Sequence, residues 1–241
     1  MTGFEALPVA ALGLFGDAFN FVFSGQEAAT GGVQVGGPEQ IIDLAAKQLQ
    51  VTLLALGVAI LLALPVGLIL GHRGRGEFLA VSAGNAGRAI PELALIALMA
   101  AAVGVGLFNL VVALAILGIP PILTNTFVGI RQVDRSSVEA ARGMGMSDRE
   151  IIAKVELPLA IPTIMGGVRT ASINIIATAT IAPLAGVLTL GDLIISRNVY
   201  GDAGVLAGAI LVALLALSLE AVLAGIQWIL TSKGLKLQRA N

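Results

Sequence analysis

Long uncharged stretches alternate with short charged intervals along this chain. Val51 to Gly71 has no charged residue and matches the roughly 20 apolar residues that cross a hydrocarbon core. Leu93 to Ile130 is also uncharged, but as a single helix it would be about 57 Å long, nearly twice the thickness of that core. We therefore predict two spans there, joined by a turn at Gly104-Val105-Gly106.

Two further spans are expected after a polar interval. Thr170 to Gly191 is uncharged but holds several hydroxyl and amide side chains, and Ala203 to Leu230 contains Glu220 as its one charged residue. Because an ionisable residue at membrane depth is expensive, Glu220 is expected to be functional or critical for packing, with Arg169 as a candidate partner. The pattern predicts an all-α membrane protein with about five transmembrane helices.

The first 45 residues differ from the rest. Phe4 to Phe23 is apolar but contains Glu5 and Asp17, which favours an interfacial helix over a sixth span. Ser24 to Pro38 is rich in Gly, Gln and Thr, which is typical of an exposed linker. We therefore expect an N-terminal extracytoplasmic or interfacial segment with its linker (1–45), a transmembrane domain (46–232) and a cytoplasmic tail (233–241).

The composition agrees with a membrane location. Of 241 residues, 57% are hydrophobic and 12% are charged, which is outside the range of soluble domains. A formal net charge of −1 offers no excess of cations for a nucleic-acid backbone, so no nucleic-acid partner is expected. The chain has no cysteine and one histidine, His72, so no metal site is expected.

No residue pattern of an enzyme is found. The phosphate-binding pattern G-x-x-x-x-G-K-[ST] does not occur, so this chain has no ATP site of that kind. Neither a Ser/His/Asp arrangement nor a pair of carboxylates stands at an interpretable spacing. We expect no catalytic, cofactor-binding or metal-binding residue in this chain.

Lysine and arginine are sorted by loop. With five spans, twelve of them fall on one side and two, Lys47 and Arg197, on the other. Because an excess of these residues in short loops marks the cytoplasmic side, the count predicts an outside N-terminus and a cytoplasmic C-terminus. The majority side holds Arg73, Arg75, Arg88, Arg131, Arg135, Arg142, Arg149, Lys154, Arg169, Lys233, Lys236 and Arg239.

The polar interval from Ser136 to Pro158 predicts a bent pair of short helices. Ser136 and Ser147 each stand three residues before a glutamate, which is the spacing of a helix capping box. Glycines between them allow a sharp turn, and Pro158 is expected to end the second helix because its ring clashes one turn back. Four apolar side chains are expected to anchor this loop to the membrane domain: Val138, Ile151, Ile152 and Val155.

The spacing in this interval resembles the EAA loop of ABC importer permeases. The shared residues are Glu139-Ala140-Ala141, Gly145 and Leu157-Pro158, while Val155 stands where isoleucine is preferred. In that family the loop is a coupling helix that lies in a groove of a separate ATP-hydrolysing subunit. The small Ala140 and Ala141 would let another protein approach closely. The simpler alternative is that Glu139 only caps a helix.

The resemblance thus implies an ATPase-coupling role for a defined set of residues. ATP and Mg would be bound by the partner ATPase and not by this chain. The set is Glu139, Ala140, Ala141, Gly143, Gly145, Leu157 and Pro158.

From about Gln48 to Leu230 the chain is similar to permease subunits of osmoprotectant ABC importers, those for glycine betaine, choline, carnitine and related quaternary amines. Two departures are Leu188 to Asp192, where many relatives have a Gly-Gly-Leu-Gly turn, and Glu92, where a small Ser or Thr is usual. The similarity is carried by Asn125 to Ile130 (NTFVGI), Gly143 to Ser147 (GMGMS), Glu156 to Leu159 (ELPL), Gly167 to Thr170 (GVRT) and Ala179 to Ile181 (ATI).

This likeness implies a type I ABC importer permease fold in the bacterial cytoplasmic (inner) membrane. It also implies partners: a second permease copy or a paralogue, two ATP-binding subunits, and an extracytoplasmic substrate-binding protein. Two alternatives stay open. One is an ABC permease for amino acids such as methionine, which would not share the GMGMS and GVRT runs, and the other is an ion-coupled carrier that needs no ATPase.

Polar side chains at membrane depth are the candidates for a translocation path. Such groups usually face the bundle interior or water, although interhelical hydrogen bonds would explain them as well. Glu92 is either an acid in a first helical turn or a carboxylate that faces a cationic substrate, with Arg88 as its partner. One Trp and one Tyr offer no aromatic cage for a quaternary amine, so selection is expected in the binding protein. The candidates are Glu92, Asn125, Asn174, Thr178 and Thr180.

Overall fold

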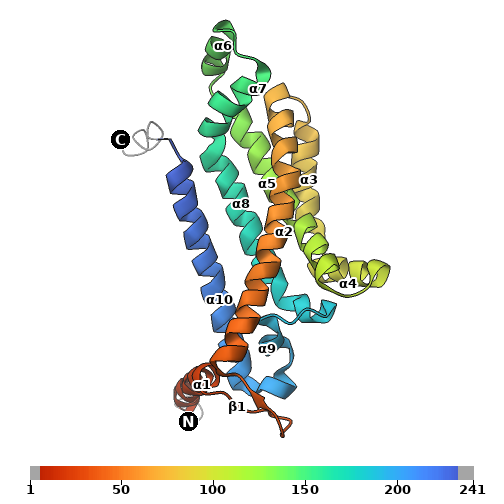
Figure 1. The fold of residues 1–241 in the computed structure, drawn as a ribbon, viewed down its shortest axis with the longest axis vertical. Helices are drawn as coiled ribbons and strands as arrows, with labels where there is room; N and C mark the ends of the chain where they lie inside the picture. The colour runs from red at the N-terminus through yellow and green to blue at the C-terminus, as the bar shows by residue number, and fades with distance from the viewer. Residues whose placement is uncertain (1–5, 233–241) are drawn as a thin grey trace. The chain divides into compact units, whose positions relative to one another are not determined.

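The computed structural model describes residues 6–232, apart from the side chains of residues 6–12, Leu79, Val81, Ala83, Ala86 and Arg88. The predicted tail at 233–241 and the residues Phe4 and Glu5 lie outside the described residues, and so does the proposed Arg88 side-chain contact. The described chain is helical except for one two-stranded hairpin and short connections (Figure 1).

In chain order the elements are α1 (Ala6–Phe23), β1 (Gln26–Glu27), β2 (Gln34–Val35), α2 (Gly37–Arg73), α3 (Glu77–Ala89), α4 (Glu92–Val103), α5 (Leu107–Arg131), α6 (Arg135–Gly143), α7 (Asp148–Ile151), the π-helix η1 (Ile152–Glu156), α8 (Leu157–Thr178), the 3₁₀-helix η2 (Ala179–Ala185), α9 (Gly191–Ile195) and α10 (Arg197–Leu230).

Four helical stretches in the described part of the chain are long and apolar enough to cross a membrane: Gly37–Arg73, Leu107–Arg131, Asp148–Ala185 and Arg197–Leu230. The span predicted to start at Thr170 is therefore wrong in its bounds, because the helix begins at Asp148. The charged residues of this first part hid the start, because the span was predicted from an uncharged run. Lys154 pairs with Glu150 one turn earlier at 2.9 Å, and such a pair stabilises a helix.

The predicted first span before Gly104 is instead two short helices. α3 ends at Ala89 and α4 starts at Glu92, and Ile90 between them is extended. A residue that precedes proline avoids the helical region, so Pro91 breaks the helix here. The turn predicted at Gly104-Val105-Gly106 is confirmed, because α4 ends at Val103, α5 begins at Leu107, and both glycines have positive φ.

The segment Ser24 to Pro38, predicted as an exposed linker, is a hairpin. Gln26 pairs with Val35 in antiparallel register, and Val35 is buried. Its glycines serve the tight backbone: at Gly36, with φ of 80°, a Cβ atom would lie 2.5 Å from the carbonyl oxygen of Phe21. The Gly-rich composition thus reflects a close approach and positive φ angles that other residues rarely adopt.

The described residues form two compact units. The first contains the described residues up to Leu53, with Ile96–Leu110 and Ile176–Leu217. Its core joins α1, the hairpin, α9 and the first part of α10, where Phe21 lies edge-on to Tyr200 at 6.2 Å between ring centroids. Two buried polar side chains bind backbone there, since Gln48 donates to the oxygen of Ile176 and Thr189 to that of Ala179.

The second unit contains Leu54–Leu95, Val111–Ile175 and the described residues from Ser218 on. Within it α2 lies very close to α5. A Cβ atom on Gly67 would stand 2.6 Å from Cβ of Thr126, and one on Gly71 would stand 2.7 Å from Cβ of Ile130. The small residues therefore let two helices approach to near backbone contact, as the Gly67 and Gly71 spacing suggests.

We expect Gly67→Ala to lower the free energy of unfolding by about 1–3 kcal/mol, because the added methyl group overpacks the contact with Thr126. Gly57→Ala on the same helix is the matched control, since nothing lies within 4 Å of a Cβ atom there. Thermal unfolding of both variants in detergent measures the difference. Equal melting temperatures would contradict this packing.

Candidate functional site

The polar loop begins with a helix cap that differs from the predicted one. α6 starts at Arg135, and the Asp134 side chain accepts a hydrogen bond from the Ser136 backbone N–H at 3.1 Å. Hydrogen bonds from the Ser136 hydroxyl and N–H lower the pKa of Asp134. The predicted capping box of Ser136 with Glu139 is therefore wrong, and the exposed Glu139 is not a cap of this helix.

The turn after α6 is a Schellman motif built on Gly145. The Gly145 N–H donates to the oxygen of Arg142 and the Met146 N–H to that of Ala141, at 3.0 and 3.2 Å. Gly145 has φ of 85°, which strains any residue with a side chain. The predicted sharp turn is thus confirmed. The backbone conformation at position 145 is by itself a reason for glycine there.

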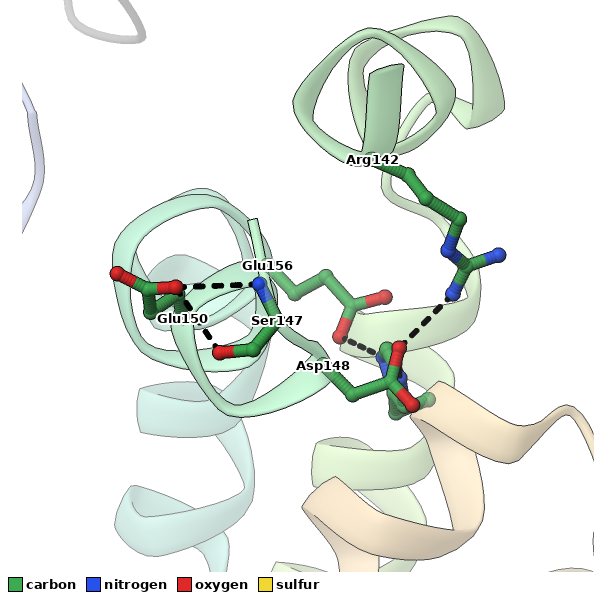
Figure 2. A network of polar contacts seen from close by, with 6 residues as sticks. Arg142, Ser147, Asp148, Glu150 and Glu156 are labelled. Atoms are coloured by element: carbon green, nitrogen blue, oxygen red, sulfur yellow. Dashed lines mark hydrogen bonds and ion pairs between the residues drawn. The ribbon is translucent and has the colours of Figure 1, made fainter. Parts of the chain in front are cut away.

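The second predicted cap is confirmed. Glu150 Oε2 accepts from the backbone N–H and the hydroxyl of Ser147, at 3.1 and 2.9 Å, so that α7 starts with a capping box (Figure 2). Pro158, expected to end this helix, does not do so, because the helix continues through η1 into α8. The wider π-helical turn over Ile152–Glu156 comes directly before the proline and gives room for its ring.

An apolar cluster, called the loop cluster here, fixes α6 and α7 to the membrane helices. Val138, Ile151 and Val155 belong to it as predicted, and Ile152 is half-buried. Ala141 was expected to face a partner, but it is 2% exposed and lies inside the cluster. The buried members are Ile130, Val133, Val138, Ala141, Ile151, Ala160 and Ile164, with Leu64, Leu68, Met146, Val155 and Leu157 packed against them.

The exposed face of the loop carries the remaining coupling candidates. Glu139, Ala140, Gly143 and Gly145 are exposed, whereas Leu157 and Pro158 are half-buried. Met144, at the turn, is 73% exposed and was missed as a candidate. Met144 thus adds an apolar side chain to the exposed candidates at this turn.

A chain of polar and charged side chains, also missed, links this loop to the end of α2. Arg142 donates to Asp148 at 3.0 Å. His72 lies 3.4 Å from that Asp148 oxygen through Nε2 and 2.7 Å from Glu156 through Nδ1. Figure 2 shows the carboxyl groups of Asp148 and Glu156 turned toward a common point, and the distances identify the shared side chain as His72. The lone histidine and the spaced acids give no local signal, because the contact spans 84 residues.

Three of the five path candidates lie together on one cavity in the second unit. The cavity has a volume of about 510 Å³, and Glu92, Asn125 and Asn174 line it. Glu92 is in the first turn of α4, as one alternative proposed. Gly84 and Gly87 of α3 lie very close to Thr124 and Pro120 of α5 here, so these positions have no room for a larger residue. The full lining is Gly84, Gly87, Ile90, Glu92, Leu117, Pro120, Pro121, Thr124, Asn125, Thr170 and Asn174.

The other two path candidates lie in the first unit and not on this cavity. Thr178 is buried, and the Thr180 hydroxyl donates to the oxygen of Ala177 at 2.7 Å. That hydrogen bond satisfies the hydroxyl within its own helix. Thr124 and Thr170 line the cavity instead, and they were not selected as candidates from the sequence. Among the described residues, no three His, Asp or Glu side chains gather as metal ligands would.

Glu220 has the partner proposed from the sequence. Arg169 Nε donates to Glu220 Oε1 at 2.7 Å, and its Nη1 donates to Gln227 Oε1 at 2.9 Å. Gln227 in turn donates to the carbonyl oxygen of Pro162 at 3.3 Å. These contacts join α8 to the last part of α10 within the second unit.

The family of the chain follows from its sequence match. A family model described as the binding-protein-dependent transport system inner membrane component matches residues 59–228, which covers every helix of the cavity and the loop. The chain belongs to this family. It is therefore an ABC transporter permease of the inner membrane, a subunit that is not itself catalytic.

Several curated relatives of this permease carry substrate names. The glycine betaine/carnitine/choline transport system permease protein OpuCB of Bacillus subtilis is 36% identical over 85% of this chain and 94% of its own length. The carnitine transport permease protein OpuCB of Listeria monocytogenes is 36% identical over 79% and 88%. The osmoprotectant import permease protein OsmY of Salmonella typhimurium is 33% identical over 76% and 79%.

Solved structures support the type I permease fold. A chain of the MetNI methionine ABC transporter in an inward-facing conformation aligns with a TM-score of 0.69 over 80% of this permease and 96% of that chain. A chain of an amino acid ABC transporter aligns at 0.60 over 78% and 92%. Both are 22% identical, so they bear on the fold alone.

In this permease we expect Glu220→Ala to lower the free energy of unfolding by about 1–3 kcal/mol, because it leaves the half-buried Arg169 without its carboxylate. Asp202→Ala is the matched control on the same helix, since its pair with Arg197 is exposed and contributes little to stability. Thermal unfolding in lipid nanodiscs measures both. A control as destabilised as Glu220→Ala would contradict this role of the pair.

Proposed function

We propose that this permease moves a small quaternary-ammonium osmolyte, such as glycine betaine, choline or carnitine, into the cytoplasm by alternating access. A separate ATPase subunit drives the movement. The names of the relatives at 33–36% identity favour this substrate class. The amino-acid alternative, which would share the EAA-like loop, gains no support from the methionine transporter structures, because they are 22% identical and bear on the fold alone.

The coupling surface is the exposed face of α6 with the following turn. The observation that carries this proposal is the division of α6 into two faces. Val138 and Ala141 lie in the loop cluster, while Glu139, Ala140 and Met144 are exposed. A carboxylate, a small side chain and an apolar side chain together suit a groove on another protein. ATP and Mg are then bound by that partner.

The assembly we propose has two permease chains, identical or paralogous, two ATPase subunits and one external binding protein. One bundle supplies only half of a central path, and closed symmetry is the usual solution. The loop faces the cytoplasm, where ATP is available. This orientation, with the N-terminus outside, requires α3 and α4 together to complete a fifth crossing, and the sorting of Lys and Arg supports it.

The cavity chemistry suits a small cation or zwitterion. Its volume is in the range of small-molecule sites, about 300–1,000 Å³. Glu92 supplies a carboxylate, which attracts a quaternary amine. The amide groups of Asn125 and Asn174 can donate hydrogen bonds to a substrate carboxylate. The hydroxyls of Thr124 and Thr170 already donate to the backbone oxygens of Ala80 and Gly166, so they offer oxygen acceptors there. No aromatic ring lines the described cavity, so the high-affinity site is assigned to the binding protein.

We expect Ala140→Arg to abolish ATP-driven uptake, about a hundredfold or more, because a long charged side chain blocks close approach of the ATPase at an interface hot spot. The permease should still reach the membrane, since Ala140 is exposed. Ala153→Arg, the same change at an exposed position outside α6, is the control and should keep uptake. Copurification of the ATPase separates lost binding from lost transport. Full uptake by Ala140→Arg would rule out this surface.

We expect Glu92→Gln to reduce uptake of choline, a net cation, about tenfold, and uptake of the zwitterion glycine betaine by much less. Removing the carboxylate costs the cation about 1.4 kcal/mol, whereas the carboxylate of the zwitterion offsets part of the loss. Radiolabelled uptake with the cognate ATPase and binding protein measures the ratio. Glu77→Gln, an acid in the first turn of α3 outside the cavity, is the control. Equal loss for both solutes would contradict the role of Glu92, and uptake of methionine alone would overturn the substrate class.

A further inference from the structure

His72 occupies an unusual position at the end of α2. Its imidazole lies between two carboxyl groups of the polar loop, with Nδ1 2.7 Å from Glu156 Oε2 and Nε2 3.4 Å from Asp148 Oδ1. The His72 and Glu156 side chains are 9% and 5% exposed, whereas that of Asp148 is 68% exposed. The histidine thus holds one buried and one exposed acid, and these belong to different segments of the loop.

The number of protons on the ring decides how many of these contacts can form. A neutral imidazole has one N–H and one lone pair, whereas an imidazolium has two N–H groups. With the single proton on Nδ1, which is nearest to Glu156, the Nε2 lone pair faces the Asp148 carboxylate and repels it. With both protons, each nitrogen donates to its own carboxylate.

The charges around His72 act in opposite directions, because the carboxylates of Glu156 and Asp148 favour the imidazolium and the neighbouring arginines oppose it. Arg142 of α6 binds the same Asp148 oxygen, and Arg131 of α5 and Arg135 of α6 line the small cavity that His72 and Glu156 share. These arginines are permanently charged. Histidine is the side chain whose charge changes near physiological pH, so it is the group in this cluster suited to switch there.

We propose that His72 is a positioning residue of the loop, and that its protonation strengthens the attachment of α6 and α7 to α2 through Asp148. This inference rests on the coupling role proposed above. The imidazolium holds the loop at both Glu156 and Asp148. As pH rises through the range in which the ring loses its proton, the Asp148 contact is lost and the Glu156 contact stays, so force from an ATPase passes less directly to α2.

The test uses the complete importer in proteoliposomes, with ATP inside and the internal pH set between about 6 and about 8, the range in which imidazole changes charge. The measured quantity is the uptake by His72→Gln divided by the uptake by wild type at each pH, which removes the pH dependence of the ATPase. We expect a ratio near one third at pH 6, the size of one partly exposed ion pair, that rises toward one at pH 8. A ratio that does not change with pH overturns the proposal.

Two further variants keep the result decisive. Asp148→Ala removes the exposed acceptor and should show the same rise of the ratio with pH, at a lower level because its pair with Arg142 is lost at every pH. It decides the question if His72→Gln does not assemble with the ATPase. Arg73→Gln neutralises an exposed charge on the neighbouring residue and should show a constant ratio. Wild type without any ATP-driven uptake would contradict the proposed function itself. Wild-type uptake with a flat ratio in both His72→Gln and Asp148→Ala would contradict only the role of His72.

Discussion

The contact on which the function of the second unit depends is the apolar cluster between the polar loop and the membrane helices. A segment as polar as 134–158 would not by itself adopt one position at the end of a helical bundle, because water solvates it equally well in many positions. Val138, Ala141 and Ile151 remove this freedom by burying their side chains against α2, α5 and α8. The loop cluster therefore turns a solvated connection into a defined surface, and only a defined surface can receive force.

The polar contacts of the loop fix the orientation of its helices, which the buried apolar side chains do not fix alone. Apolar packing is not directional, so it fixes the distance of α6 from the bundle better than its rotation. The Schellman turn at Gly145, the capping box at Ser147 and the ion pairs around Asp148 fix the rotation, because hydrogen bonds weaken steeply away from their preferred angles. The exposed Glu139 and Met144 face away from the cluster as a consequence.

The sequence predicted much of this arrangement, and its errors have physical causes. Long uncharged runs located the main helices, and local rules found the Ser147 cap and the turn at Gly145, since both depend on residues close in sequence. Local rules failed where a neighbour in sequence offered a better solution, as Asp134 did for the cap assigned to Ser136. They failed at Pro158 because a π-helical turn is not encoded by any short pattern. The contacts of His72 join residues 84 positions apart, and no periodicity reports these.

One helix connects the two candidate sites of the second unit. The segment that starts at Asp148 continues through η1 into α8 without an interruption, and it reaches Thr170 and Asn174 on the cavity about 26 residues later, roughly 39 Å at 1.5 Å per residue. A hydrogen-bonded helix of that length is stiff, so a displacement of α7 must move the cavity lining or be absorbed somewhere between. The π-helical turn before Pro158 interrupts the regular hydrogen-bond pattern of this helix. There Glu156 contacts His72, and Leu157 lies against the loop cluster. In the coupling that we propose, motion of the loop would therefore pass along α8, and the hydrogen bond from Arg169 to Glu220 would carry part of it to α10.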